Sequence, residues 1–527
     1  MSALPMDHSS RFDRRAALKA GIAGGLAAAL ARTSSGFTAP LMANTNHKLL
    51  TIFLRGGHDA NSVVIPYGDP GYSVANRGIL NSATGANGTF IPSANALALS
   101  GALPNPLAVG LSPALAPVLP LVNATSPRLV FLHAVGNPAR TGSHFDDMRT
   151  WETAIPQCSI PSGFDLEEGW VTRVVSELLG GGIGAASVSE TMQQLYRTRL
   201  LPNNTFRPDR VLPHVRALRN YPDNTAGVYS LGTTMPALDT KLTGVVGPPP
   251  SGLRALFSGG AGKDAFARVV GRQMVESAVA AAPVVTTDYI PMGAAMYPFG
   301  MTGVGATHPY TTPANAGLLA DNGQIRRFFM YLRDAMALLR DVPGVNVAGI
   351  ELGGFDTHSD QGGFDQNPAV NAIRGQLAQL INAVAFGVAS VDAEVQAGAF
   401  SGGSLTVLVI SEFGRTSAVN NSGGTDHGGS TCVWVAGNRV VPSVTSGVVF
   451  NTAPSEWPGL FSANDQTFGC PGNPLSPPPY QFMRIATDYR AVYARIFRQL
   501  YGVNSTQIDQ VIPGYSTAGL VEPVFLV

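Results

Sequence analysis

The sequence predicts a three-layer α/β/α fold with a mostly parallel central sheet. Short apolar segments without polar alternation recur along the chain, as expected for strands that are buried on both faces. Between them lie segments in which apolar residues recur at spacings of three and four, the pattern of helices that pack on a sheet. Strands that alternate with helices in this way are typical of a largely parallel sheet between helical layers.

Five segments have the composition of buried strands. Each is a short apolar run that ends in glycine or in polar residues. In open α/β sheets, ligands bind at the carboxyl ends of the strands, and this chain places its polar residues there. The predicted strands lie within residues 47–59, 128–137, 345–356, 404–414 and 431–437.

Apolar periodicity predicts four helices. The last of them has Thr487 or Asp488 as its N-cap and stops at Gly502, since glycine readily adopts the left-handed conformation that ends helices. The predicted helices are residues 264–282, 323–342, 369–391 and 486–502.

The region from about residue 180 to residue 320 has a different composition. It is rich in Pro and Gly and contains no dense cluster of polar residues. We expect it to be an inserted cap, or a long excursion over the edge of the sheet, within one domain that spans residues 44–527.

The overall composition excludes several classes of protein. Of the 527 residues, 45% are apolar, which is too high a content for a disordered chain. The formal charge is zero, and no cluster of Lys and Arg occurs beyond the N-terminus, so nucleic acid is not an expected partner. The three cysteines lack the spacing of a zinc finger. We therefore expect a globular protein that does not bind nucleic acid.

The N-terminus has the features of an export signal. Arg14 and Arg15 precede a mildly apolar stretch, residues 20–31, that is too short to span a bilayer as a helix. The arrangement resembles a twin-arginine signal peptide, which predicts a periplasmic or extracellular protein. We expect the signal to occupy residues 1–43 and the mature chain to have no transmembrane segment. A basic amphipathic helix on a soluble protein is the alternative interpretation.

Histidine and aspartate concentrate at the predicted strand ends. His58, His144, His358 and His427 each lie beside or near an Asp, in RGGHDANS, GSHFDD, GGFDTHSD and GGTDHGGS. Imidazole and carboxylate groups together bind divalent cations such as zinc, manganese or iron. If the strand conformation continues, Asp356 and His358 point to the same face of the sheet. These patterns predict a metal site.

The segment SEFGRT adds two charged residues at another strand end. Glu412 contributes a further carboxylate, and the guanidinium group of Arg415 is suited to a bidentate pair with phosphate or sulfate. Alternatively, Glu412 is a buried structural carboxylate that pairs with Arg415.

Several motifs resemble, in order and wording, those of an uncharacterised bacterial family known as domain of unknown function 1501. The resemblance runs from about residue 47 to residue 502. That family is similar in turn to the alkaline phosphatase and sulfatase superfamily, whose members hold one or two divalent metals at the strand ends of a mixed sheet. The motifs are FLRGGHDANSVVIPYGDPGY, SHFDDMRTWETA, GGFDTHSDQ, SEFGRT followed by SGGTDHG, and TDYRAVY.

The resemblance implies a metal site and a set of catalytic residues. It implies that Ser143, at a helix start, is the nucleophile and that Arg140 or Arg415 holds the substrate oxyanion. Two motifs depart from the superfamily, which has Asp-His where this chain has Glu412 and Phe413, and which separates the Asp and His of the third motif by three residues. The residues that the resemblance assigns to one or two metal ions are Asp59, Asp356, His358, Glu412, Asp426 and His427.

The sequence therefore predicts an exported, metal-dependent hydrolase of phosphate or sulfate esters, with a small-molecule or polymer ester as its substrate. The alternative is a non-catalytic exported protein that uses the same fold for binding or assembly, an interpretation that the altered fourth motif favours. Metal content and hydrolysis of an aryl phosphate distinguish the two.

Overall fold

The computed structural model describes residues 47–99, 107–156, 168–178, 184–190, 193–197, 214–215, 323–342, 344–369, 373–400, 404–461, 468–470, 473–475 and 482–527. The chain divides into an N-terminal unit, Met1–Leu41, and a second unit, Met42–Val527. The expected signal peptide, most of the expected insert and the helix predicted at residues 264–282 lie outside the described residues.

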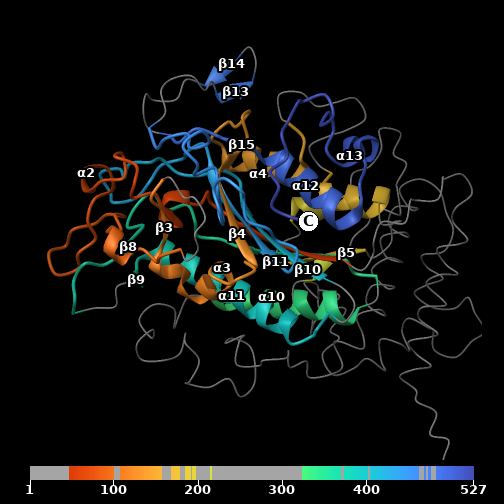
Figure 1. Cartoon of the computed structure of the whole chain (residues 1–527), viewed down its shortest axis with the longest axis horizontal. Helices are drawn as coiled ribbons and strands as arrows, with labels where there is room; N and C mark the ends of the chain where they lie inside the picture. The colour runs from red at the N-terminus through yellow and green to blue at the C-terminus, as the bar shows by residue number, and fades with distance from the viewer. Residues whose placement is uncertain are drawn as a thin grey trace, which may run out of the picture. The chain divides into compact units, whose positions relative to one another are not determined.

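A mixed, mostly parallel sheet forms the centre of the second unit (Figure 1). Its strands, in spatial order, are β12 (Val449–Phe450), β4 (Leu129–Gly136), β11 (Thr431–Gly437), β10 (Ser404–Ser411), β1 (His47–Leu54), β7 (Val347–Leu352), β5 (Ala185–Val188) and β6 (His214–Val215), and β15 (Thr487–Asp488) also pairs with β4. Strand β11 is antiparallel to both of its neighbours, whereas the other pairs of this sheet are parallel.

The five predicted strands are confirmed as β1, β4, β7, β10 and β11. Every residue of β4 is buried, and the other four strands are buried over most of their length, which explains why their sequences are mostly apolar without polar alternation. Pairs of short strands outside the central sheet show no periodicity in the sequence and were not predicted. They are β2 (Val64–Ile65) with β3 (Gly110–Leu111), β8 (Gly363–Phe364) with β9 (Ile373–Arg374), and β13 (Phe468–Cys470) with β14 (Asn473–Leu475).

Strand directions bring five loops to one edge of this sheet. Strands β10, β1 and β7 are parallel and end in register, with Leu54 opposite both Ser411 and Leu352. Because β11 is antiparallel to β10, the loop before Thr431 enters the sheet at the edge where the other three strands leave it. Strand β4 is antiparallel to β11, so it also ends at this edge, at Gly136. The residues that follow β1, β4, β7 and β10 therefore meet those that precede β11.

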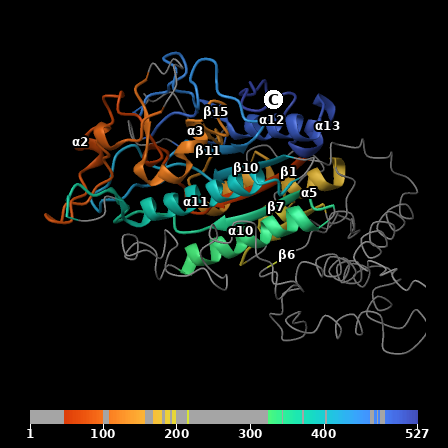
Figure 2. The same cartoon turned by 60° about the horizontal axis from the view of Figure 1, so that its bottom comes forward.

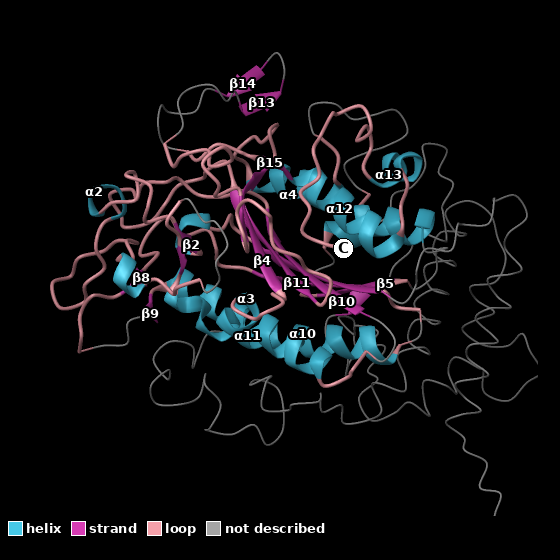
Figure 3. Cartoon of the chain, viewed as in Figure 1, coloured by secondary structure: helices cyan, strands magenta, loops and turns pink. Residues whose placement is uncertain are grey.

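The predicted helices that fall in the described residues all form. Helices α10 and α11 lie along one side of the sheet, and α4 and α12 lie on the other (Figures 2 and 3). The longer helices are α4 (His144–Thr153), α10 (Gly323–Asp341), α11 (Gln376–Gln396), α12 (Tyr489–Tyr501) and α13 (Ser505–Val511). The short ones are α2 (Val74–Arg77), α3 (Leu119–Val122), α5 (Trp170–Arg173), the 3-10 helices η1 (Ala60–Ser62), η2 (Ser93–Asn95), η3 (Pro113–Val118) and η5 (Gln194–Tyr196), and the π-helix η4 (Val174–Leu178).

Two helix boundaries illustrate what local sequence decides. The side chain of Asp488 accepts a hydrogen bond from the Arg490 amide, and Gly502 adopts the left-handed conformation, so both predicted caps of α12 are confirmed. The predicted start of α11 at residue 369 is wrong, since the helix begins at Gln376. The residues just before it, in β9, pair with β8 instead, and such a pairing leaves no local signal.

Helix α11 is the one described helix that is long and apolar enough to cross a membrane by length and composition. Most of it is buried, and it packs against β10, β11 and η3. Burial in the core accounts for its apolar composition.

Candidate metal centre

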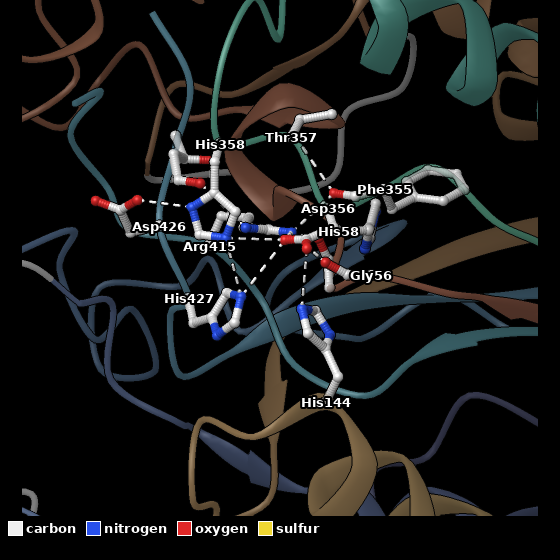
Figure 4. A network of polar contacts seen from close by, with 12 residues as sticks. Gly56, His58, His144, Phe355, Asp356, Thr357, His358, Arg415, Asp426 and His427 are labelled. Atoms are coloured by element: carbon white, nitrogen blue, oxygen red, sulfur yellow. Dashed lines mark hydrogen bonds and ion pairs between the residues drawn. The ribbon is translucent and has the colours of Figure 1, made fainter. Parts of the chain in front are cut away.

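Three imidazole rings converge on the carboxylate of Asp356 at the loop-rich edge of the sheet (Figure 4). The Nε2 atoms of His358 and His427 lie 3.0 and 3.4 Å from Oδ1 of Asp356, and Nε2 of His144 lies 3.3 Å from Oδ2. The Nε2 atoms of His358 and His427 are 3.1 Å apart. We call these four residues the His–Asp cluster. Its members come from three segments: His144 is the first residue of α4, after β4; Asp356 and His358 follow β7; and His427 precedes β11.

Each imidazole of the cluster is held through Nδ1 by an acceptor oxygen. Because the partner can only accept, Nδ1 carries the hydrogen, and the neutral ring then presents a lone pair at Nε2. Metal-binding histidines are commonly oriented by such partners. The three acceptors, each 2.8 Å from Nδ1, are Oε1 of Glu412 for His144, Oδ1 of Asp426 for His358 and the carbonyl oxygen of Gly142 for His427.

Glu412, expected to bind a metal, lies behind His144. Its carboxylate is completely buried and also accepts hydrogen bonds from the Gly56 amide at 2.8 Å and the Ser411 hydroxyl at 3.1 Å. The hydrogen bond to Glu412 raises the pKa of His144. Asp426 has the corresponding position behind His358, and half of its side chain is exposed.

Arg415 holds the loops of the site together. Its buried guanidinium group donates to the carbonyl oxygens of Gly57 at 2.7 Å, Thr425 at 3.0 Å and Phe355 at 3.0 Å, and it also bonds Gly56. The same group donates to Oδ1 of Asp356 at 2.5 Å. Burial by itself would raise the pKa of Asp356, but the hydrogen bond and charge of Arg415 lower it, so the carboxylate stays ionised. These contacts occupy the guanidinium group that was predicted to hold a substrate oxyanion.

Asp59 lies apart from the cluster, in a buried ion pair. Its Oδ2 is 2.5 Å from Nη2 of Arg77, and it accepts hydrogen bonds from the Ser62 hydroxyl and the Gln361 amide at 2.7 Å each. Burial would raise the pKa of Asp59, but Arg77 lowers it. The structure thus places this predicted metal-bridging residue where its oxygens already have protein partners.

The loop between β4 and α4 positions both His144 and the partner of His427. Asp147, in the first turn of α4, accepts hydrogen bonds from the amides of Thr141 and Gly142, and burial raises the pKa of its carboxyl to about 6. The Gly142 carbonyl is thereby directed toward His427.

The two remaining predicted catalytic residues belong to this same loop. Ser143 is the N-cap of α4, as predicted, but its side chain makes no capping hydrogen bond. Arg140 is buried, with its guanidinium carbon 4.9 Å from the centre of the Phe482 ring. Burial lowers the pKa of Arg140 to about 10.

The reason that Asp356 and His358 meet differs from the prediction. Strand β7 ends at Leu352, so the expectation that strand conformation continues through these residues is wrong. The chain turns instead at Gly354, whose φ of +97° is accessible mainly to glycine. The loop after β1 also approaches closely, because a Cβ atom on Gly56 would lie 2.3 Å from the amide nitrogen of Asp356. Loop geometry, rather than the strand pleat, brings the two side chains together.

His144 is the cluster residue that sequence reasoning did not assign to the metal. Its local sequence pattern is a histidine near an Asp at a strand end, and three other histidines have the same pattern. One of these, His58, lies in the core, where burial lowers its pKa to about 4 and Nδ1 contacts the Thr431 hydroxyl at 2.8 Å. The local pattern alone therefore does not separate a cluster histidine from a core histidine.

A family model matches part of the chain. Residues 330–456 match the family described as Protein of unknown function (DUF1501), in agreement with the resemblance that the motifs indicate. The matched segment contains Asp356, His358 and His427 but not His144. No curated protein matches the chain.

Proposed function

We propose that this protein is an exported, metal-dependent hydrolase of phosphate or sulfate esters, with one divalent ion bound by the His–Asp cluster. The observation that carries the proposal is the convergence of three Nε2 atoms on one carboxylate while every Nδ1 is bonded to an acceptor. Two neutral Nε2 atoms at 3.1 Å would face each other with lone pairs, an arrangement that a cation between them stabilises.

The distances between these atoms support a single ion. Two nitrogen ligands, each about 2.0–2.1 Å from a tetrahedral zinc ion, lie roughly 3.3 Å apart. In the cluster, the Nε2 atoms of His358 and His427 are 3.1 Å apart, and the three Nε2 atoms lie 3.0 to 3.4 Å from an oxygen of Asp356. Nε2 of His144 is also buried, and in the described part of the chain it forms no hydrogen bond, although it lies 3.3 Å from Oδ2 of Asp356; a nitrogen that shares a metal ion with that carboxylate has this position.

The cluster is open to solvent on one side. The side chains of Asp356 and His358 are 45% and 47% exposed. Catalytic metal sites keep a position free for water or substrate, whereas structural sites are closed. Such a position exists if three members of the cluster bind a four-coordinate ion, or if all four bind a five-coordinate ion. A bound divalent ion lowers the pKa of a water ligand and polarises an ester oxygen, which is the chemistry that ester hydrolysis needs.

The protein's own residues orient the reacting groups in this proposal. Glu412 and Asp426 keep the Nδ1 protons of His144 and His358 in place, and Arg415 keeps Asp356 ionised. Ser143, next to His144 in the chain, is the proposed nucleophile, with water as the alternative, and Arg140 is the proposed oxyanion partner. We further propose that the mixed sheet and its helices form a three-layer, alkaline-phosphatase-like fold with residues 180–320 as a cap, and that residues 1–43 direct twin-arginine export.

Metal analysis and hydrolysis assays test the proposal. The purified full chain should contain about one equivalent of a divalent metal and should hydrolyse an aryl phosphate or an aryl sulfate, and chelation should remove the activity. A stoichiometric metal without turnover of either ester would instead support the non-catalytic binding protein. Purified protein that takes up no divalent metal would overturn the site assignment.

A further inference from the structure

A cavity of about 580 Å³ lies between α4, α10 and the end of β7. Some of its lining residues are close in sequence to members of the His–Asp cluster. None of the four cluster residues lines it, yet Phe145 directly follows His144, and Gly353 precedes Asp356 by three residues. Its volume is within the range of small-molecule sites. The residues that line it show what kind of molecule it suits.

Carboxylates form one part of the cavity wall. Arg55 donates to Glu152 through Nη1 and Nη2, at 3.0 and 2.8 Å, and to Glu351 through Nε at 2.9 Å. This group of three residues carries one net negative charge. A carboxylate accepts about four hydrogen bonds, so both retain capacity beyond what Arg55 uses. They are suited to accept hydrogen bonds from hydroxyl groups of a ligand.

A buried amide also lines the cavity without a partner. Gln193 is 2% exposed, and neither Oε1 nor Nε2 has a hydrogen-bond partner within the described residues. Its main-chain nitrogen is bonded to the Ser187 hydroxyl at 3.3 Å, which anchors the residue. Leaving a buried polar group unsatisfied costs about 1–3 kcal/mol, so a buried amide without a protein partner is suited to a partner from ordered water or from a ligand. Both atoms are buried, so a ligand hydroxyl, which both donates and accepts, would reach this amide once the side chain turns toward the cavity.

Two arginines on different helices supply positive charge. Arg149 on α4 and Arg327 on α10 are exposed, and neither forms an ion pair in the part of the chain that the structure describes. Guanidinium groups bind carboxylate, phosphate and sulfate groups through paired hydrogen bonds. Phe145 lies one helical turn from Arg149 and is 80% exposed, so it offers an apolar surface to the C–H groups of a ligand.

We infer that this cavity binds a monosaccharide-sized ligand that carries an anionic group. The anion lies against Arg149 and Arg327, and the hydroxyl groups contact Gln193, Glu152 and Glu351. Strong binding requires both groups of contacts. The arginines alone would bind any anion without selectivity. The carboxylates favour a ligand whose hydroxyl groups donate hydrogen bonds to them, and they repel an anion that has no hydroxyl groups. The inference requires only the cavity, so it does not depend on the proposed hydrolysis.

Titration calorimetry on the full chain tests this inference with three probes. Glucuronate combines a carboxylate with sugar hydroxyls, glucose lacks the charge, and acetate lacks the sugar. We expect saturable binding of glucuronate and at least about tenfold weaker binding of glucose and acetate, because hydrogen bonds to charged groups contribute roughly that factor or more. No saturable binding of glucuronate, or equal affinity for acetate, would overturn the inference.

Matched variants assign the binding to the cavity. Arg327→Ala should weaken glucuronate binding about tenfold, whereas Arg374→Ala, which removes an exposed arginine outside the cavity, should leave it unchanged. Gln193→Met should also weaken glucuronate binding. If this substitution of a buried residue prevents folding, Arg327→Ala still tests the site, because Arg327 is exposed. His358→Ala should bind glucuronate as the unmodified protein does, since His358 does not line the cavity. Binding that is lost in His358→Ala and kept in Arg327→Ala would assign the anion to the His–Asp cluster and refute the cavity site.

Discussion

Oε1 of Glu412 lies 2.8 Å from Nδ1 of His144, so this buried carboxylate orients an imidazole of the cluster instead of pointing into it. The two residues are 268 positions apart in the chain, and they meet because β4 and β10 deliver their following loops to the same edge of the sheet. A hydrogen-bonded carboxylate of this kind fixes the tautomer of a metal-binding histidine and increases its basicity. Substitution of Glu412 should therefore lower the affinity for metal less than substitution of a cluster residue does.

Glu412→Gln should lower the affinity for metal about 10–100-fold without abolishing binding. The amide keeps the size of the side chain and can still accept from Nδ1, but it lacks the charge that strengthens the hydrogen bond. Competition with a chelator of known affinity measures the change. A loss as complete as that of His358→Ala would show that Glu412 itself binds the metal.

His358→Ala should reduce the metal content well below one equivalent while the protein stays folded. Its side chain is 47% exposed, so truncation creates no core cavity. Elemental analysis gives the metal content, and circular dichroism checks the fold. His47→Ala is the matched control, because His47 is at the start of β1, away from the loops of the site. Equal metal content in the two variants would remove His358 from the ligand set.

Arg77→Met should lower the free energy of unfolding by about 3–5 kcal/mol, because it leaves the buried Asp59 carboxylate without its charge partner. Urea denaturation measures this loss. Because Asp59 pairs with Arg77, we also expect the Asp59→Asn variant, under conditions in which it is folded, to have the same metal content as the unmodified protein. Metal loss in folded Asp59→Asn would return Asp59 to the metal site.

The stability of the protein should fall in acid partly through Asp59. Because Arg77 holds the folded-state pKa of Asp59 below its unfolded value of about 4, the ion pair stabilises the fold fully above that pH. The contribution is lost progressively as the pH falls toward the folded-state pKa. Urea midpoints of chelator-treated protein between pH 3 and 7 measure it. The decline should be shallower in Arg77→Met, and an equal decline in both proteins would contradict this role.

Gly354→Ala should destabilise the protein by about 1–3 kcal/mol, whereas Gly353→Ala should have little effect. Gly354 has a φ of +97°, and an added Cβ would lie 2.9 Å from Oε1 of Gln324. At Gly353 the nearest atom to an added Cβ is 3.9 Å away, and the backbone has no positive φ. Thermal unfolding of the two variants provides the comparison. Equal stability would mean that the turn before Asp356 tolerates a side chain.

The strands and caps could be predicted from the sequence because their signals are local. A mostly apolar run without polar alternation, such as the one in β4, reflects burial on both faces, and the caps of α12 depend on residues within one turn of the helix ends. The edge of the sheet that carries the site also followed from the sequence, since polar residues stand at the strand ends. The local pattern gave the wrong start for α11. Residues that fit the helical periodicity there belong instead to β9, which pairs with β8.

The sequence by itself determined which residue types gather at this edge, but only the tertiary structure decided what each side chain does there. Asp59 and Asp356 both follow a buried strand and a pair of glycines. Yet Arg77 binds one in a buried pair, and three imidazoles surround the other. An arginine binds each carboxylate, Arg77 at Asp59 and Arg415 at Asp356, so exposure makes the difference. The Asp59 side chain is 1% exposed and protein donors use its oxygens, whereas that of Asp356 is 45% exposed and remains available to a ligand. The segments that cover one carboxylate and leave the other open are distant in the chain, so local sequence does not reveal the difference.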